Sequence, residues 1–325
     1  MRVLIIGASG FIGTKLATRL AADGRLGSEV ILSLTLADVT VPEDAPQPSV
    51  GIALDLTDSA AVSSALKRYM PDVIFHLAAV VSGDAETNFD LGYSVNVGGT
   101  RNLLDAVRSA GTAGDGPPYR PRLVFTSSLA VFGSPLPRSV PDGQLRTPRS
   151  SYGTQKAACE LLVEDYSRKG HVDGISVRFP SIAVRPGAPN LAASSFISGI
   201  VREPLAGLGA VCPVPPDTEC CVASPGAAVG YLLRAARLSG TELDGSRTLS
   251  VPGLTVSVAE MIEALGRVAG EEVAGLIRHE PDPFVAGIVA SWPRHMEATR
   301  ARALGFRGDD SYDDIIRAYM KEDRA

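Results

Sequence analysis

The sequence lacks the features that mark membrane proteins, secreted proteins and nucleic-acid-binding proteins. No apolar run in its 325 residues approaches the roughly 20 residues that a membrane span needs. Lys and Arg number 31 against 36 Asp and Glu, without a long charged run, so no basic face for nucleic acid is indicated. The first expected strand begins at Arg2, which leaves no room for a signal peptide. We therefore expect a cytoplasmic protein without a membrane or nucleic-acid partner.

Residues that bind metals are also few and scattered. The four cysteines show no C-x-x-C spacing, and the four histidines lie far apart at positions 76, 171, 279 and 295. Zinc sites gather such residues at short, regular spacings. The sequence therefore predicts no metal site, and we expect the cysteines to be reduced and structural.

Alternating strands and helices are what the first half of the chain contains. Apolar runs predict strands over 2–6, 30–37, 73–77, 123–126 and 174–179. Helical periodicity is found between them, over 13–22, 60–69, 94–110 and 151–167. Such alternation is typical of an α/β protein with a doubly wound parallel sheet, the Rossmann arrangement.

The pattern changes after Pro180, where Pro and Gly become frequent. We expect a nucleotide-binding domain over 1–180 and about 223–253, because a helix near 225–238 and a strand near 247–251 return to the sheet. Residues 181–222 and 254–325 are predicted to form a smaller α/β substrate-binding domain, with a last helix over 312–321.

The segment "GASGFIG" follows the first strand and opens the first helix. In this context Gly7 allows a tight turn, Gly10 lets the backbone approach a pyrophosphate, and Gly13 lets the helix pack close to the strand. The helix N-terminus presents unpaired N–H groups to the anion. The spacing predicts a dinucleotide site.

Acidic residues end the next two strands. Asp38 can accept both ribose hydroxyls of adenosine and would repel a 2′-phosphate, so NAD is favoured over NADP. Asp55, with Leu56, is placed where a carboxylate can meet the adenine edge. A turn cap is the alternative for Asp38, and a helix cap before Ser59 is the alternative for Asp55.

A tyrosine and a lysine lie four residues apart in "SSYGTQKAACE". The spacing puts Tyr152 and Lys156 on one helix face. A nearby ammonium and the helix N-terminus favour the phenolate, so we expect a lowered pKa for Tyr152 and a role as proton acceptor. Ser128, at the end of the strand in "LVFTSSLAVFG", can hold the substrate oxygen beside it. A surface pair and a serine bonded to backbone are the alternatives.

Seven segments, in order, carry a family resemblance: "GASGFIG", Asp38, "HLAA", "NVGGT", "TSSLAVFG", "YGTQK" and "RFP". As a set they resemble the extended short-chain dehydrogenase/reductases, the NAD-dependent epimerase/dehydratase group. The resemblance implies a homodimer, NAD as cofactor, and Ser128, Tyr152 and Lys156 as the catalytic residues. It implies further cofactor contacts from Phe11, Ile12, Leu77, Ala78, Ala79, Asn96, Pro180 and Ser181, besides Tyr152 and Lys156 themselves.

The substrate is indicated by what the second half keeps and lacks. Relatives that bind nucleotide sugars carry an Arg before the helix near 225 and an Asp at its start, whereas this chain has "PPDTECCVASPG". The segments "FISGIVREPLAG" and "SWPRHMEATRARALGF" resemble those members of the group that oxidise D-erythronate, a four-carbon sugar acid, at its C2 hydroxyl. Substrate contacts are then expected from Ser82, Ser128, Tyr152, Asn190 and Arg202.

Several alternatives stay open. Arg185 is a second candidate for the substrate carboxylate, and a salt bridge is the alternative role for Arg202. A uronate dehydrogenase acting at C1 and a nucleotide-sugar 4-epimerase would use the same three catalytic residues. An NAD sensor without catalysis is disfavoured, because such relatives generally lose the Tyr or Lys.

Overall fold

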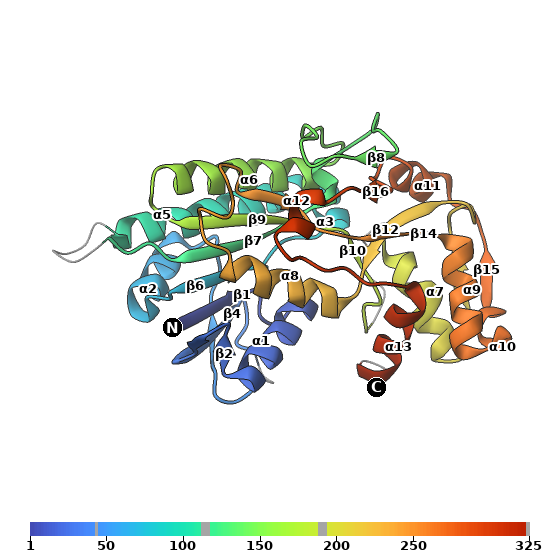
Figure 1. The fold of residues 1–325 in the computed structure, drawn as a ribbon, viewed down its shortest axis with the longest axis horizontal. Coiled ribbons are helices and arrows are strands. Elements are labelled where there is room, and N and C mark those ends of the chain that lie inside the picture. Colours follow the sequence, from blue (N-terminus) through green and yellow to red (C-terminus); the bar gives the residue numbers. More distant parts are fainter. Residues whose placement is uncertain (43–44, 112–117, 188–193, 323–325) are drawn as a thin grey trace.

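The computed structural model describes residues 1–42, 45–111, 118–187 and 194–322. Its centre is a seven-stranded sheet in which every neighbouring pair is parallel (Figure 1). The strands in spatial order are β13 (Thr248–Ser250), β9 (Asp173–Phe179), β7 (Arg122–Ser128), β6 (Val73–His76), β1 (Arg2–Ile6), β4 (Ser33–Asp38) and β5 (Val50–Ala53). The predicted doubly wound Rossmann fold is confirmed.

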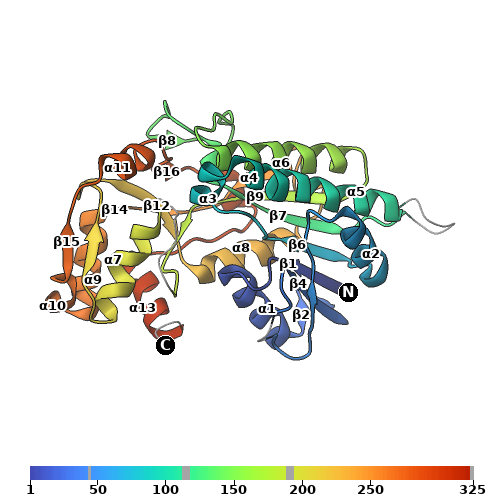
Figure 2. The same cartoon turned by 180° about the vertical axis from the view of Figure 1, so that it is seen from behind.

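Helices cover both faces of this sheet because its strands are apolar on both sides. In β1, Val3 and Ile5 face a core with α1 (Phe11–Asp23) and α8 (Pro225–Arg237). Leu4 and Ile6 face the opposite core. That second core is closed by α2 (Ser59–Tyr69), α5 (Gly99–Gly111) and α6 (Ser151–Arg168). Figures 1 and 2 show these two layers on either side of the sheet.

Several predicted boundaries were wrong. The helix expected over 94–110 begins with a π-helical turn, Tyr93–Gly98, before α5. The strand expected from residue 30 begins at Ser33, because β2 (Arg25–Leu26) and β3 (Glu29–Val30) form a separate hairpin. Two short helices that were not predicted, α3 (Ser82–Thr87) and α4 (Phe89–Gly92), follow β6.

A second group of elements lies beyond the carboxyl ends of the main strands, at the right of Figure 1. Its strands are β10 (Ser181–Ile182), β12 (Glu219–Ala223) and β14 (Leu254–Ser257), with a separate pair, β11 (Ala210–Cys212) and β15 (Ile277–His279). Its helices are α7 (Ser195–Leu205), α9 (Val258–Ala269), α10 (Glu271–Ala274), α11 (Pro283–Val289) and α13 (Tyr312–Glu322). They enclose their own apolar core, which includes Ile197, Met261, Leu265 and Ile316.

The C-terminal part of the chain also returns to the main sheet. β16 (His295–Met296) pairs with β8 (Ser139–Val140), and α12 (Thr299–Ala303) follows. Ala298, Ala301 and Phe306 pack into the core that α1 and α8 share. The division into two domains stays a prediction, and this packing argues for assigning 298–306 to the nucleotide-binding domain.

The described residues provide neither a membrane-spanning helix nor a cluster of metal ligands. No helix in this part of the chain is both long and apolar enough to cross a membrane. Nor does the same part bring three His, Cys, Asp or Glu side chains together in a way that could hold a metal ion.

The packing of α1 against the glycine loop predicts that Gly13→Ala is destabilising. A Cβ at Gly13 would lie 2.1 Å from the Gly7 carbonyl oxygen, so backbone must move. We expect unfolding in urea to show a loss of about 1–3 kcal/mol, typical of overpacking. Gly230→Ala in α8 is the matched control, since a Cβ there meets nothing within 4 Å. It should stabilise by about 0.5–1 kcal/mol. Equal effects at both positions would contradict this account.

Candidate active site

The order of the strands creates a crevice at their carboxyl ends. The chain turns from β1 to β4 on one side and places β6 on the other. In open α/β sheets, ligands bind where the winding reverses in this way. The glycine loop after β1 and the residues after β6 form the two lips of the crevice.

The two lips lie in backbone contact. Gly7 has a φ of +88°, and a Cβ there would be 2.5 Å from the Ala78 amide nitrogen. Leu77 and Ala78 donate their N–H groups to the Ile6 carbonyl at 2.8 and 3.1 Å. Any side chain at Gly7 would push the lips apart.

The N-terminus of α1 is open to an anion. Gly10 precedes the helix, no side chain caps it, and its first turn carries no acidic residue. Unpaired N–H groups and the helix dipole therefore favour a negative group here. These features fit the pyrophosphate of NAD, and they place Phe11 and Ile12 in the first turn beneath it.

Asp38, the residue predicted to bind the adenosine ribose, lies next to the glycine loop. It ends β4 beside the glycine loop, where its Oδ2 accepts from the Ser9 amide at 2.9 Å and its Oδ1 from the Val39 amide at 2.8 Å. The carboxylate is thus oriented toward the loop, as ribose recognition requires. Asp55 is exposed and accepts from the backbone and hydroxyl of Thr57 at 2.8 Å, which is a turn cap. Leu56 is buried beneath Gly99.

Asn96 orders the lip after β6. Its buried side chain accepts from the Val80 amide at 2.8 Å and donates to the Val80 carbonyl at 3.1 Å. A second donation, at 2.7 Å, reaches Gln155 on α6. Asn96 therefore joins this lip to the helix that carries Tyr152, and its place in the π-helical turn provides the reach.

The segment after β9 closes the crevice on the side of the second group of elements. Pro180 is buried, and Ser181 begins β10, which pairs with β12. Pro180 and Ser181, which are predicted to contact the cofactor, are therefore held between the main sheet and the smaller one.

Ser128 and Tyr152 are brought together by a close approach of backbone. A Cβ at Gly153 would be 2.1 Å from the Ala130 carbonyl oxygen, so the start of α6 lies against the turn after Ser128. Ser150 caps α6 by accepting from the Gly153 amide at 3.1 Å. The Ser128 and Tyr152 hydroxyls are hydrogen-bonded to each other. The predicted pair therefore shares one site.

Lys156 lies one turn further along α6 and is only 2% exposed. Its Nζ donates to the Thr126 carbonyl at 2.8 Å and lies 5.6 Å from the centre of the Tyr152 ring. Burial lowers the pKa of Lys156 to about 8, although Cys159 and Glu160 oppose the change. The ammonium is thus held by the sheet directly behind Tyr152.

The expected direction of the Tyr152 pKa was wrong for this structure. Burial raises the pKa of Tyr152 to about 12, against the positive charge of Arg185 and the hydrogen bond from Ser128. Desolvation penalises the phenolate more than the neighbouring groups favour it. A proton acceptor at neutral pH therefore needs further positive charge in the crevice.

Sequence reasoning missed a buried ionic group beneath these residues. Glu160 contacts Ser127, Arg146 and Arg178. One signal was present: Glu160 follows Lys156 by four residues, which places both on the same face of α6.

The residues predicted to bind the substrate lie in different environments. Ser82 is half-buried at the start of α3. Arg202 donates to Glu203 at 2.6 Å and to the Arg185 carbonyl at 2.8 Å, so both ends of its guanidinium have protein partners. Arg185 acts electrostatically on Tyr152. Asn190 lies outside the described residues.

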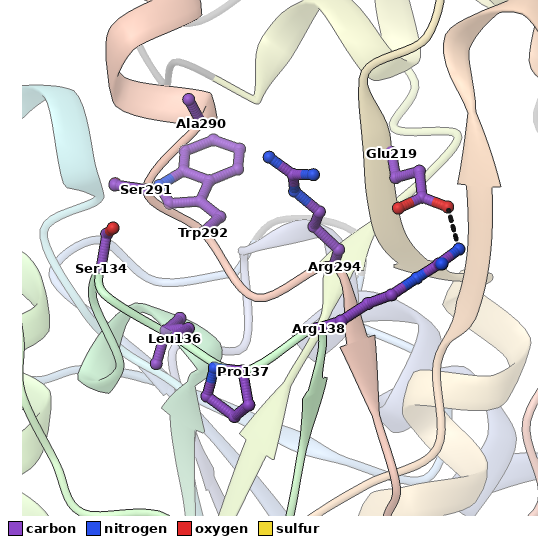
Figure 3. A pocket seen from close by; sticks show the side chains of 9 residues that line it. All are labelled: Ser134, Leu136, Pro137, Arg138, Glu219, Ala290, Ser291, Trp292 and Arg294. Atoms are coloured by element: carbon purple, nitrogen blue, oxygen red, sulfur yellow. Dashed lines mark ion pairs between the residues drawn. The ribbon is translucent and has the colours of Figure 1, made fainter.

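A pocket of about 400 Å³ lies between the loop after Gly133, the start of β12 and the segment after α11 (Figure 3). None of the predicted site residues lines it. Its wall holds Arg294, Trp292 and an ion pair of 3.8 Å between Arg138 and Glu219. Ser291, Trp292 and Arg294 belong to the segment "SWPRHMEATRARALGF", which carries part of the resemblance described above.

Fold and site together define an NAD-binding oxidoreductase scaffold. The chain belongs to the NAD dependent epimerase/dehydratase family, whose model matches residues 3–218. The residues of the crevice fit NAD, the cofactor of that family.

Three relatives cover almost the whole chain. A D-erythronate dehydrogenase of Cupriavidus necator is 47% identical over 99% of this chain and 98% of its own length. One from Haemophilus influenzae is 40% identical over 99% of this chain and its whole length. The crystal structure of a nucleoside-diphosphate-sugar epimerase from Agrobacterium tumefaciens is 48% identical with a TM-score of 0.94, covering 99% of this chain and 94% of that one.

The geometry of Asp38 predicts the effect of Asp38→Ala on the cofactor. Hydrogen bonds to a charged group contribute about 1.5–3 kcal/mol, so NAD should bind roughly 10- to 100-fold more weakly. The preference for NAD over NADP should shrink, because a 2′-phosphate no longer meets a carboxylate. Quenching of protein fluorescence on titration with each nucleotide measures both effects. Equal affinity of the unsubstituted protein for NAD and NADP would contradict the assignment.

Proposed function

We propose that this chain is an NAD-dependent dehydrogenase that oxidises the C2 hydroxyl of a small sugar acid, D-erythronate, to the 2-oxo acid. The observation that carries the proposal is the assembly of Ser128, Tyr152 and Lys156 at the carboxyl ends of the strands, beside a crevice that fits NAD. The names of two relatives that match the full chain supply the substrate.

The proposed chemistry is a proton transfer coupled to loss of hydride from the same carbon. Ser128 and Tyr152 hold the C2 hydroxyl, and the Tyr152 phenolate takes its proton while the C2 hydrogen leaves with its electron pair. When bound, NAD supplies the hydride acceptor and a cationic ring that favours the phenolate. Lys156 holds its positive charge behind Tyr152, and the C2 oxygen becomes a carbonyl.

The carboxylate of the substrate needs a cationic partner, and the contacts favour Arg185. Its charge already acts on Tyr152, whereas the guanidinium of Arg202 is bonded to Glu203 and to the Arg185 carbonyl. We assign Arg185 the carboxylate and Arg202 the support of the Arg185 backbone. The Ser198 hydroxyl, which accepts from the Arg185 amide at 3.0 Å, holds the same backbone from α7.

A nucleotide-sugar epimerase is the second candidate, favoured by the name of the Agrobacterium relative. Two features disfavour it. The helix α8 begins with Ser224 as a cap and has no acidic residue in its first turn. The strand before it, β12, contains no arginine that could bind a diphosphate, and its one charged residue, Glu219, is ion-paired with Arg138 at 3.8 Å.

The proposal includes a homodimer and a cytoplasmic location. Phe89 on α4 is 57% exposed and Leu161 on α6 is 54% exposed, and Figure 2 shows these helices side by side. Exposed apolar side chains of this size on adjacent helices support a subunit interface. All four cysteines are free and buried, which supports a reducing compartment.

Turnover of D-erythronate tests the function directly. Purified protein with NAD should form NADH, followed by its ultraviolet absorbance, with D-erythronate and not with L-threonate, D-glucuronate or D-galacturonate. Tyr152→Phe should lower kcat by at least about 100-fold, because the phenyl ring cannot take the proton. NAD binding by this variant, measured by fluorescence, serves as the control for folding.

Variants of the two arginines show where the carboxylate binds. Arg185→Ala should raise KM for D-erythronate by roughly 10- to 100-fold, the loss of one charged hydrogen-bonded contact. Arg202→Ala should have a smaller effect. The reverse order would move the carboxylate to Arg202. Turnover of uronates alone would place the chemistry at C1, and activity only on a nucleotide sugar would establish the second candidate.

A further inference from the structure

A buried carboxylate joins the elements that carry the catalytic groups. Glu160 is 0% exposed. Its Oε1 accepts from the Ser127 hydroxyl at 2.6 Å and from Arg178 Nε at 2.8 Å. Its Oε2 accepts from Arg178 Nη2 at 2.7 Å and from Arg146 Nε at 2.5 Å. Four hydrogen bonds from three residues therefore converge on one side chain.

Each partner stands next to a part of the active site. Ser127 precedes Ser128 on β7, and Glu160 lies one turn beyond Lys156 on the same face of α6. Arg178 is two residues before Pro180 on β9, and its guanidinium stacks 4.7 Å from the ring centre of Phe132. Figure 1 shows α6 running along β7 and β9. Glu160 thus ties the helix to both strands at the level of the site.

This carboxylate is ionised. Burial alone would raise its pKa, but the hydrogen bonds and charge of Arg178, with Ser127 and Arg146, hold the pKa of Glu160 below its usual value. A buried charge is tolerated only when it is paired and hydrogen-bonded, and these contacts meet that condition. Glu160 and its two arginines therefore form a fixed charged group between α6 and the strands β7 and β9.

Among the groups that face Lys156, Glu160 supplies the negative charge. On α6, Tyr152 and Cys159 are both neutral at neutral pH, because burial raises the pKa of each. From β6 comes His76, also neutral, because burial lowers its pKa to about 3. From β7 come the Thr126 carbonyl and the face of the Phe125 ring, 4.7 Å from Nζ.

We propose that Glu160 is a positioning residue for the dehydrogenase reaction, fixing Ser128 through Ser127 and balancing the buried ammonium of Lys156. This inference rests on the proposed function for its kinetic readout. It separates into two parts that different substitutions test. Ser127→Ala removes the tie to β7 and keeps the charge, whereas Glu160→Gln keeps the shape and removes the charge.

The pH dependence of kcat/KM distinguishes the two parts. Lys156 must be charged, so activity falls as pH rises through its pKa. In Glu160→Gln this falling limb should move to lower pH by about one unit, since an anion beside the ammonium is lost. Ser127→Ala should lower kcat by about 10-fold, because one hydrogen bond to a charged group is lost. The pH at which kcat/KM falls should not change in this variant. Glu164→Gln is the matched control: it also removes a carboxylate charge that accepts from Arg146, at 3.0 Å, and should change neither quantity.

NAD affinity gives a readout that needs no turnover. Lys156 is expected to bond the nicotinamide ribose, so NAD binding should weaken with rising pH at a lower pH in Glu160→Gln than in the unsubstituted protein. If activity or NAD binding falls at the same pH in Glu160→Gln and in the unsubstituted protein, Glu160 does not balance the charge of Lys156. Wild-type kcat in Ser127→Ala would overturn the tie to β7, even if Glu160→Gln does not fold. Absence of turnover by the unsubstituted protein would contradict the proposed function instead, and the binding experiment would still decide the role of Glu160.

Discussion

The active site depends on a lysine ammonium that the fold buries almost completely. Two groups favour the charged form of Lys156. The Thr126 carbonyl on β7 accepts a hydrogen bond from its Nζ, and the ionised Glu160 lies one helical turn away. Burial strengthens the field that this ammonium exerts on Tyr152, since little water screens it. The same burial raises the pKa of Tyr152, so the positive charges around the phenol must outweigh desolvation. The negative charge of Glu160, which favours the charged form of Lys156, is the proposed contribution of the fold to this balance.

The second constraint is the close approach of backbone segments, which requires glycine at three positions. Gly7 brings the lips of the crevice together, Gly13 seats α1 on the loop, and Gly153 seats α6 on the turn after Ser128. Each contact replaces a side chain with backbone at one edge of the sheet. The first two shape the predicted NAD site, and the third brings Ser128 and Tyr152 together. Both sites are therefore built by the same packing device.

The sequence predicted those features in which a local pattern has one physical solution. Strand–glycine–helix spacing predicted the close backbone contacts of the glycine loop, and the i, i+4 spacing placed Tyr152 and Lys156 on one face of α6. Features set by distant contacts could not be predicted in this way. Asn96, in the π-helical turn, bonds Val80, sixteen residues away, and the Glu160 group requires two strands, a helix and a loop to meet. The predicted direction of the Tyr152 pKa shift was wrong, because spacing in the sequence shows neighbouring charges but not desolvation. The hydrogen-bond partners of Arg202 likewise follow only from the three-dimensional structure.

The position of hydride loss is the central claim, and a labelled substrate tests it most directly. D-Erythronate carrying deuterium only at C2 would be oxidised by the protein with unlabelled NAD, and the NADH examined by mass spectrometry. The account predicts that the deuterium is transferred to the NADH. Unlabelled NADH formed from this substrate would contradict the account, because the hydride would have left another carbon.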